Sequence, residues 1–285
     1  MFALPNRSGS HLPMSGINQV VVYCVCRLKS HFVDPIGNRK SCSGTGFWIR
    51  HKGQPVLATN RHNVDAKLFY GESSEYTLRE LEVELRNTIG DNFTGETKFF
   101  SVKDLEDVLF KSEDADVAIL RAPKFTSPLD DFGYKCFAFG DIADSTFFSS
   151  KVSIMDFASF VGYPGRNGKS WWDISNNLGI ARTVNVASIP GAAFQHSDVR
   201  TTDVTLVSGL SFSGSSGSVV LLHQKGIAPT GDIVDSSFVP VKIIGIMSGH
   251  WSDAENGSGM FQHTGLSYYT RSTALVHLLE RTASQ

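Results

Sequence analysis

Serine, histidine and aspartate, which together can perform acyl transfer, all occur in this chain in suggestive sequence contexts. The most specific of these contexts is that of a serine. Ser216 lies in Gly214-Ser215-Ser216-Gly217-Ser218, directly before the apolar run 219–222. A Gly-x-Ser-Gly turn presents a hydroxyl beside converging backbone N–H groups, as a nucleophile and its oxyanion hole require. Gly214 and Ser216 are the two N–H donors that we expect in this hole. The alternative is a loop whose Gly and Ser residues only turn the chain.

A base and an orienting acid precede this serine. An apolar segment ends at Thr59-Asn60 and leads into His62, and Asp116 stands at the head of the apolar run 117–120. The order His62, Asp116, Ser216 is that of the chymotrypsin-type triad rather than that of subtilisins or α/β-hydrolases. His62 is the expected general base and Asp116 the residue that orients it. Asp114 and Ser213 remain the alternatives for the acid and the nucleophile.

Five short motifs in order resemble the signatures of trypsin-like serine peptidases, nearest to the glutamyl-endopeptidase and HtrA-type branches. They are Gly44–Ile49, Ala58–His62, Asp116–Leu120, Val161–Gly165 and Gly214–Ser218. The resemblance implies an all-β fold of two antiparallel six-stranded β-barrels with a C-terminal helix. It also implies a serine endopeptidase that works through an acyl-enzyme, acts on a protein or peptide substrate, and needs no metal or organic cofactor. A catalytically silent pseudoprotease that binds or scaffolds, and an esterase with the same triad, are the alternatives.

The motif alignment also implies a substrate pocket beside the nucleophile. Its expected residues are Leu210, Ser211, Met247, Ser248, Gly249 and Gly265. Leu210, six residues before Ser216, is expected at the base. An apolar base cannot offset the cost of desolvating a cation, so cleavage after Lys or Arg is not expected. We expect cleavage after apolar or small uncharged residues.

Two further features bear on regulation and on substrate contacts. Digestive enzymes of this type carry an acidic residue where this chain has Ser215, and it pairs with a newly cut N-terminus. Because this chain lacks that acidic residue, we expect it to be active without such a cut. Activation by a regulatory partner is the alternative to activation by cleavage. Trp171 and Trp172 are expected either to pack the lobes together or to form a shelf for substrate.

Composition excludes several classes of function. The chain has 285 residues, 41% of them hydrophobic and 19% charged, with a net charge of −2. Nucleic acids and anionic membranes usually require a basic patch, so neither is an expected partner. The segment 1–16 lacks the apolar core of a signal peptide, and no run is long enough to span a membrane. A cytoplasmic location is therefore expected.

Four cysteines all lie in the first half of the chain, at positions 24, 26, 42 and 136. Cys24 and Cys26 fall in the alternating run 20–28, which predicts two thiols on one face of a strand. The burial tendency of free cysteine favours adjacent buried thiols. A metal site would require more Cys or His nearby than the sequence shows.

Short apolar segments between turn residues divide the chain into two lobes of six strands. The expected boundaries are a flexible arm over 1–16, a first barrel over 17–125, a linker over 126–150, a second barrel over 151–271 and a capped helix over 272–285. The expected strands of the first barrel are 20–26, 46–49, 56–59, 81–85, 98–102 and 117–121. Those of the second barrel are 159–162, 178–186, 204–206, 219–222, 241–247 and 266–270.

Overall fold

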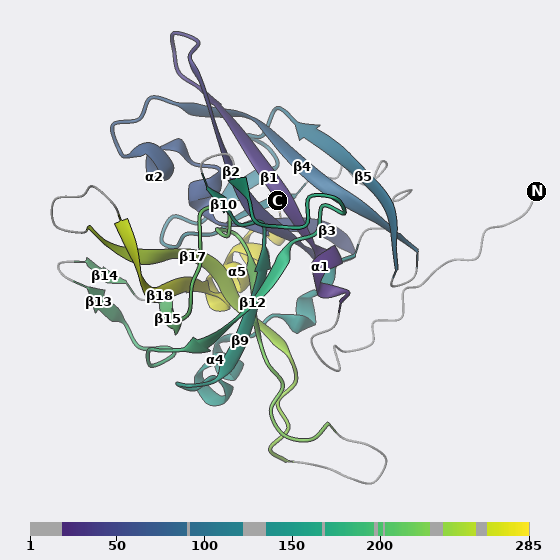
Figure 1. Cartoon of the computed structure of the whole chain (residues 1–285), viewed down its shortest axis with the longest axis vertical. Coiled ribbons are helices and arrows are strands. Elements are labelled where there is room, and N and C mark those ends of the chain that lie inside the picture. Colours follow the sequence, from purple (N-terminus) through teal and green to yellow (C-terminus); the bar gives the residue numbers. More distant parts are fainter. Residues whose placement is uncertain are drawn as a thin grey trace, which may run out of the picture.

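A computed structural model shows a mostly β chain in two lobes with a helix at its C-terminal end (Figure 1). It describes residues 19–89, 92–121, 135–166, 169–196, 199–201, 203–228, 236–254 and 261–284. The expected N-terminal arm and residues 126–134 of the expected linker lie outside these ranges. The prediction of a mostly β fold with a C-terminal helix is confirmed.

The first lobe is an eight-stranded sheet. Its strands are β1 (Val25–Val33), β2 (Arg39–His51), β3 (Gln54–Thr59), β4 (Thr77–Ile89), β5 (Asn92–Val102), β6 (Leu109–Lys111), β7 (Ala118–Arg121) and β8 (Phe137–Ala138). The hydrogen-bonded order is β5-β4-β1-β2-β3-β7-β6, and β8 pairs in parallel with β2. This order does not return to its first strand, so the expected six-stranded barrel is replaced here by a larger open sheet.

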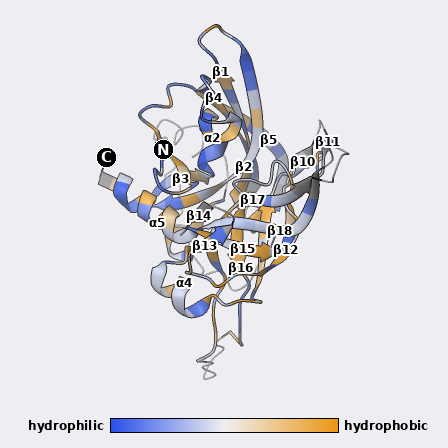
Figure 2. Cartoon of the chain, turned by 90° about the vertical axis from the view of Figure 1, so that its left-hand side faces the viewer, coloured by the Kyte–Doolittle hydropathy of each residue, from blue (hydrophilic) through white to orange (hydrophobic). Residues whose placement is uncertain are grey.

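The second lobe contains six principal strands. They are β9 (Phe157–Gly162), β12 (Ile180–Val186), β15 (Val204–Ser208), β16 (Val219–Leu222), β17 (Lys242–Ala254) and β18 (Phe261–Arg271). Their antiparallel order, β12-β15-β18-β17-β16-β9, closes on itself. Two small hairpins accompany them, β10 (Gly165–Arg166) with β11 (Lys169–Ser170) and β13 (Phe194–His196) with β14 (Val199–Thr201). Hydrophobic residues concentrate along the strands of this lobe in Figure 2.

The expected strand over 20–26 begins instead as a helical turn, α1 (Val21–Cys24). The backbone N–H groups of Val22 and Tyr23 donate to the carbonyls three residues earlier, so this β-branched run turns before β1 begins. Cys24 and Cys26 are both buried, but Cys24 packs between the lobes and Cys26 in the first-lobe core. The prediction that the two thiols share one strand face is therefore wrong.

The helix α5 (Ser272–Arg281) joins the lobes. Its buried residues Leu275, Leu278 and Leu279 belong to one apolar cluster with side chains of both lobes. We expected a Ser or Thr cap, but the Ser272 hydroxyl donates to the carbonyl of Ala143 at 2.7 Å and caps nothing. Leu275 is fully buried, so α5 is part of the folded core.

The shorter helical segments are α2 (Ala66–Tyr70), α4 (Ser145–Lys151), η1 (Arg61–Asn63), η3 (Phe139–Asp141) and η4 (Thr282–Ser284). Helix α4 begins inside the expected linker, ends one residue beyond it, and buries Phe148 in the core of the second lobe. None of the helices in the described ranges is long and apolar enough to cross a membrane.

Candidate active site

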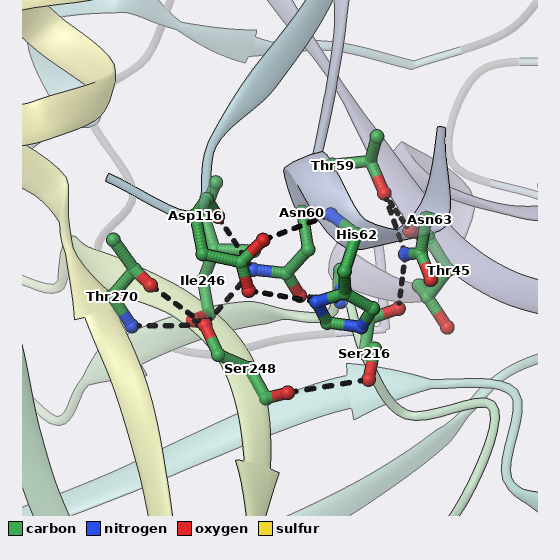
Figure 3. Close-up of polar contacts among 11 residues, drawn as sticks. Thr45, Thr59, Asn60, His62, Asn63, Asp116, Ser216, Ile246, Ser248 and Thr270 are labelled. Atoms are coloured by element: carbon green, nitrogen blue, oxygen red, sulfur yellow. Dashed lines mark hydrogen bonds and ion pairs between the residues drawn. The ribbon is translucent and has the colours of Figure 1, made fainter. Parts of the chain in front are cut away.

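Strand pairing explains why two of the three candidate residues meet. Strands β3 and β7 are antiparallel, with Thr59 opposite Ala118. His62 in η1 follows the end of β3, and Asp116 lies just before β7, so both side chains reach the same edge of the first sheet. Ser216 reaches this edge from the second lobe, in the turn before β16 (Figure 3).

The Asp116 carboxylate holds His62 at two points. Its Oδ2 lies 2.7 Å from His62 Nδ1, and its Oδ1 accepts the His62 backbone N–H at 2.9 Å. The two side chains are 19% and 28% exposed, so the pair is accessible to a reactant. Because Nδ1 contacts the carboxylate, Nε2 is the ring nitrogen left for a nucleophile. Asp114, the alternative acid, is exposed, and the structure places Asp116 against the histidine instead.

The Ser216 backbone is anchored to the first lobe. Its carbonyl accepts the Thr45 N–H at 2.8 Å and the Asn63 side-chain amide at 3.1 Å. The Ser216 hydroxyl lies beside the His62 ring and donates to the Ser248 carbonyl at 3.4 Å (Figure 3). No hydrogen bond joins this hydroxyl to His62 among the residues drawn. Catalytic hydrogen bonds are often long before substrate binds and tighten in the complex.

Glycine is required on both sides of the serine. Gly214 has a φ of 84°, and a Cβ there would lie 2.4 Å from the Tyr163 carbonyl oxygen. Gly217 has a φ of 90°, and a Cβ would lie 1.8 Å from the Thr45 carbonyl oxygen. Only glycine adopts this backbone at so close an approach. The tight turn that presents Ser216 therefore follows from these two positions.

Two backbone N–H groups at this turn make no hydrogen bond to any residue that the structure describes. Across the described ranges, neither the Gly214 nor the Ser216 N–H has an acceptor, whereas the N–H groups of Ser215, Gly217 and Ser218 are paired. Unpaired donors beside a nucleophile are the groups that stabilise a developing oxyanion. The structure thus leaves available the two donors expected from the sequence.

Sequence reasoning missed Asn60, which links all parts of the site. Its Nδ2 donates to the Asp116 carbonyl at 2.8 Å and to Ser248 Oγ at 2.9 Å, and its Oδ1 accepts the Gly217 N–H at 2.5 Å. Asn60 is completely buried. The Asn60 side chain therefore connects Asp116, the turn that carries Ser216, and Ser248, whose carbonyl accepts the Ser216 hydroxyl. A polar residue directly after an apolar strand was the available signal.

Asn63 is a second missed link between the lobes. It is 1% exposed, and besides the Ser216 carbonyl its Nδ2 donates to Thr59 Oγ1 at 2.9 Å. Phe69 of α2 covers the other side of the histidine, with ring centroids 6.5 Å apart and planes 25° apart. The histidine loop is therefore held by hydrogen bonds on one side and covered by an aromatic ring on the other.

A cavity of about 250 Å³ opens beside Ser216. Of the expected pocket residues, Ser211, Met247 and Gly249 line it, and Ser248 contributes the carbonyl that accepts from Ser216. Leu210 is 49% exposed and is not among the lining residues, so it does not form an apolar base for this cavity. Gly265 is not a lining residue either. His250 also lines the cavity, and no motif or spacing in the sequence indicates this role.

The two tryptophans have different surroundings. Trp172 packs against Tyr163 with ring centroids 5.5 Å apart, and the Arg27 guanidinium lies 5.4 Å from its ring. Trp171 is 38% exposed, and its ring lies nearly perpendicular to that of Phe212, with ring centroids 5.0 Å apart. Trp172 therefore packs the lobes together, whereas Trp171 lies at the surface beside the nucleophile loop.

The chain was also compared with known proteins. No model of a known protein family matches it, and a search of curated proteins finds no significant match. Among the residues that the structure describes, no group of three or more His, Cys, Asp or Glu side chains is placed to hold a metal ion. The chemical interpretation therefore depends on the geometry of the site itself.

Proposed function

We propose that this protein is a serine endopeptidase of the trypsin-like type. The observation that carries the proposal is the His62–Asp116 contact of 2.7 Å at the edge where Ser216 is presented beside two unpaired N–H groups. An aspartate on Nδ1, a serine on the Nε2 side and two convergent donors are the parts that acyl transfer requires. The proposal includes a trypsin-like architecture, with the site between two β lobes.

The proposed reaction assigns one role to each residue. His62 accepts the proton of Ser216 as its Oγ attacks the carbonyl carbon of the substrate. The Gly214 and Ser216 N–H groups bind the oxyanion that forms, and Asp116 holds the imidazole and stabilises the imidazolium. The same proton then passes from His62 to the leaving amine. Water, activated by His62, releases the acid and restores Ser216.

Two other functions use the same architecture. A pseudoprotease would retain the lobes and bind without turnover, and an esterase would hydrolyse only the more reactive ester bond. The intact set of His62, Asp116 and Ser216, with His62 held by the carboxylate at 2.7 Å, favours a working enzyme over a pseudoprotease.

The decisive experiment is labelling of the full chain by a fluorophosphonate probe, followed by mass-spectrometric mapping of the modified residue. We expect the probe on Ser216, no labelling of Ser216→Ala, and labelling of the matched variant Ser213→Ala. Hydrolysis of a peptide and of its ester analogue then separates a peptidase from an esterase. Unlabelled wild-type protein, or a label on Ser213, would refute the assignment.

A further inference from the structure

The cavity beside Ser216 is only partly the apolar pocket that the sequence predicts, because hydroxyl and imidazole groups line it together with Phe69, Phe212 and Met247. It extends from Gly214 and Ser216 between the segments 211–214 and 247–250. A substrate carbonyl bound by the two N–H donors would direct the preceding side chain toward this cavity. The groups that line it therefore select the residue before the cleaved bond, provided that the proposed function holds.

Hydroxyl and imidazole groups gather on one side of the cavity. Ser211 Oγ lies 3.3 Å from His250 Nδ1, 3.3 Å from the Gly249 carbonyl oxygen and 3.1 Å from Ser267 Oγ. His250 stacks on His263 with ring centroids 4.5 Å apart and planes 18° apart. Within the described part of the chain, the Ser213 side chain has no hydrogen bond, and it lines the same cavity.

The polar groups beside the cavity are hydroxyls and imidazoles. His263 Nδ1 accepts the Gly265 N–H at 2.8 Å, so this nitrogen carries no proton, and the proton of the neutral ring lies on Nε2, 3.5 Å from Ser267 Oγ. Burial also lowers the pKa of His263. None of the described residues that line the cavity is Asp, Glu, Lys or Arg. The described lining on this side therefore combines hydroxyl and imidazole groups without a Lys, Arg, Asp or Glu side chain.

Neutral polar groups discriminate among side chains by hydrogen bonding. In the described lining a carboxylate would meet no Lys or Arg, and an ammonium or guanidinium would meet no Asp or Glu. Burying a charge without an opposite charge is costly. An apolar side chain would displace water from the Ser213 hydroxyl without replacing its hydrogen bonds. A carboxamide has both a donor and an acceptor, as the hydroxyl and imidazole groups also have, and it carries no charge.

We propose that this cavity binds a carboxamide side chain, so that the enzyme cleaves after glutamine or asparagine. Ser211 and Ser213 contribute hydroxyl groups, and His250 contributes its imidazole. This inference rests on the proposed function and specifies its substrate class.

The test uses peptides that are identical except for Gln, Glu, Met or Lys before the cleaved bond. We expect the highest kcat/KM for Gln. Met matches its length without hydrogen-bonding groups, and Glu matches its shape with a charge. Loss of one hydrogen bond changes binding by roughly 2- to 12-fold, so Ser211→Ala should reduce the Gln-to-Met ratio by about that factor. Ser213→Ala, at an exposed position, repeats the test should the buried Ser211 be needed for folding.

Ser43→Ala is the matched control, because Ser43 lines the same cavity from β2 of the first lobe. It should leave the Gln-to-Met ratio unchanged. A preference for Glu, Met or Lys with Ser216 still labelled would overturn the inference and leave the proposed function standing. No hydrolysis and no labelled Ser216 would overturn both. An unchanged Gln-to-Met ratio in both Ser211→Ala and Ser213→Ala would show that these hydroxyls do not select the residue.

Discussion

Asn60 offers the sharpest test of how the site is held together. Asn60→Ala removes the hydrogen bonds to the Asp116 carbonyl, to Ser248 Oγ and to the Gly217 N–H. Ser248 Oγ also contacts Thr270, and the Gly217 N–H also reaches a carbonyl 2.9 Å away. Two of the three partners therefore keep a second hydrogen bond. The loss in free energy of unfolding is thus smaller than if all three groups were left without a hydrogen bond.

A typical intramolecular hydrogen bond contributes about 0.5–1.5 kcal/mol, and a buried group left unpaired costs about 1–3 kcal/mol. With one orphaned carbonyl and two weakened partners, we expect the free energy of unfolding to fall by roughly 2–4 kcal/mol. For a chain of this size, this corresponds to a decrease in Tm of about 4–16 °C. Calorimetry or circular dichroism on heating measures this decrease.

Asn60 is a positioning residue in this scheme, so a stability change alone does not test it. Asn60→Ala should lower kcat more than it raises KM, because the loop carrying Ser216 loses its link to the residues that hold His62. The rate of fluorophosphonate labelling at a temperature where the variant is fully folded gives a second measure.

Asn177→Gly supplies the matched control. Asn177 is also buried, but neither polar atom of its side chain has a partner among the described residues, and its φ of 51° suits glycine. It should change kcat little. A variant Asn60→Ala that loses stability yet keeps the wild-type kcat would refute the positioning role. Unchanged stability would refute the hydrogen-bond scheme itself.

Three further predictions concern the triad, the oxyanion hole and the cysteines. Ser216→Ala and His62→Ala should each lower kcat by orders of magnitude, and the double variant should be little worse than either, because the residues act as a unit; additive losses would contradict this. Gly214→Ala should lower kcat by about 100-fold with the triad intact, since its Cβ would collide with the Tyr163 carbonyl and move a donor; an unchanged kcat would exclude Gly214 from the hole. Burial raises the pKa of Cys42 to about 11, so this thiol stays protonated at pH 8 and should react with a disulfide reagent far more slowly in folded protein than in urea; equal rates would show that it is exposed.

Local features of this protein could be predicted from its sequence. Short apolar segments between turn residues locate the strands, because side-chain alternation and turn chemistry act over a few residues. Gly214 and Gly217 flank Ser216, and their positive φ angles are a property of that short turn. The histidine and the aspartate meet because each stands at the end of a strand, and the two strands pair.

Only the tertiary structure determined how these local features are arranged around the site. The run 20–26 favours a strand by composition, but packing between the lobes turns Val21–Cys24 into a helix. Leu210 is apolar, yet the path of the chain places it at the surface, and His250 lines the cavity that it was expected to shape. Asn60 bonds to partners 56, 157 and 188 residues away. Such contacts depend on how distant strands pack, and neither periodicity nor motif spacing specifies that packing.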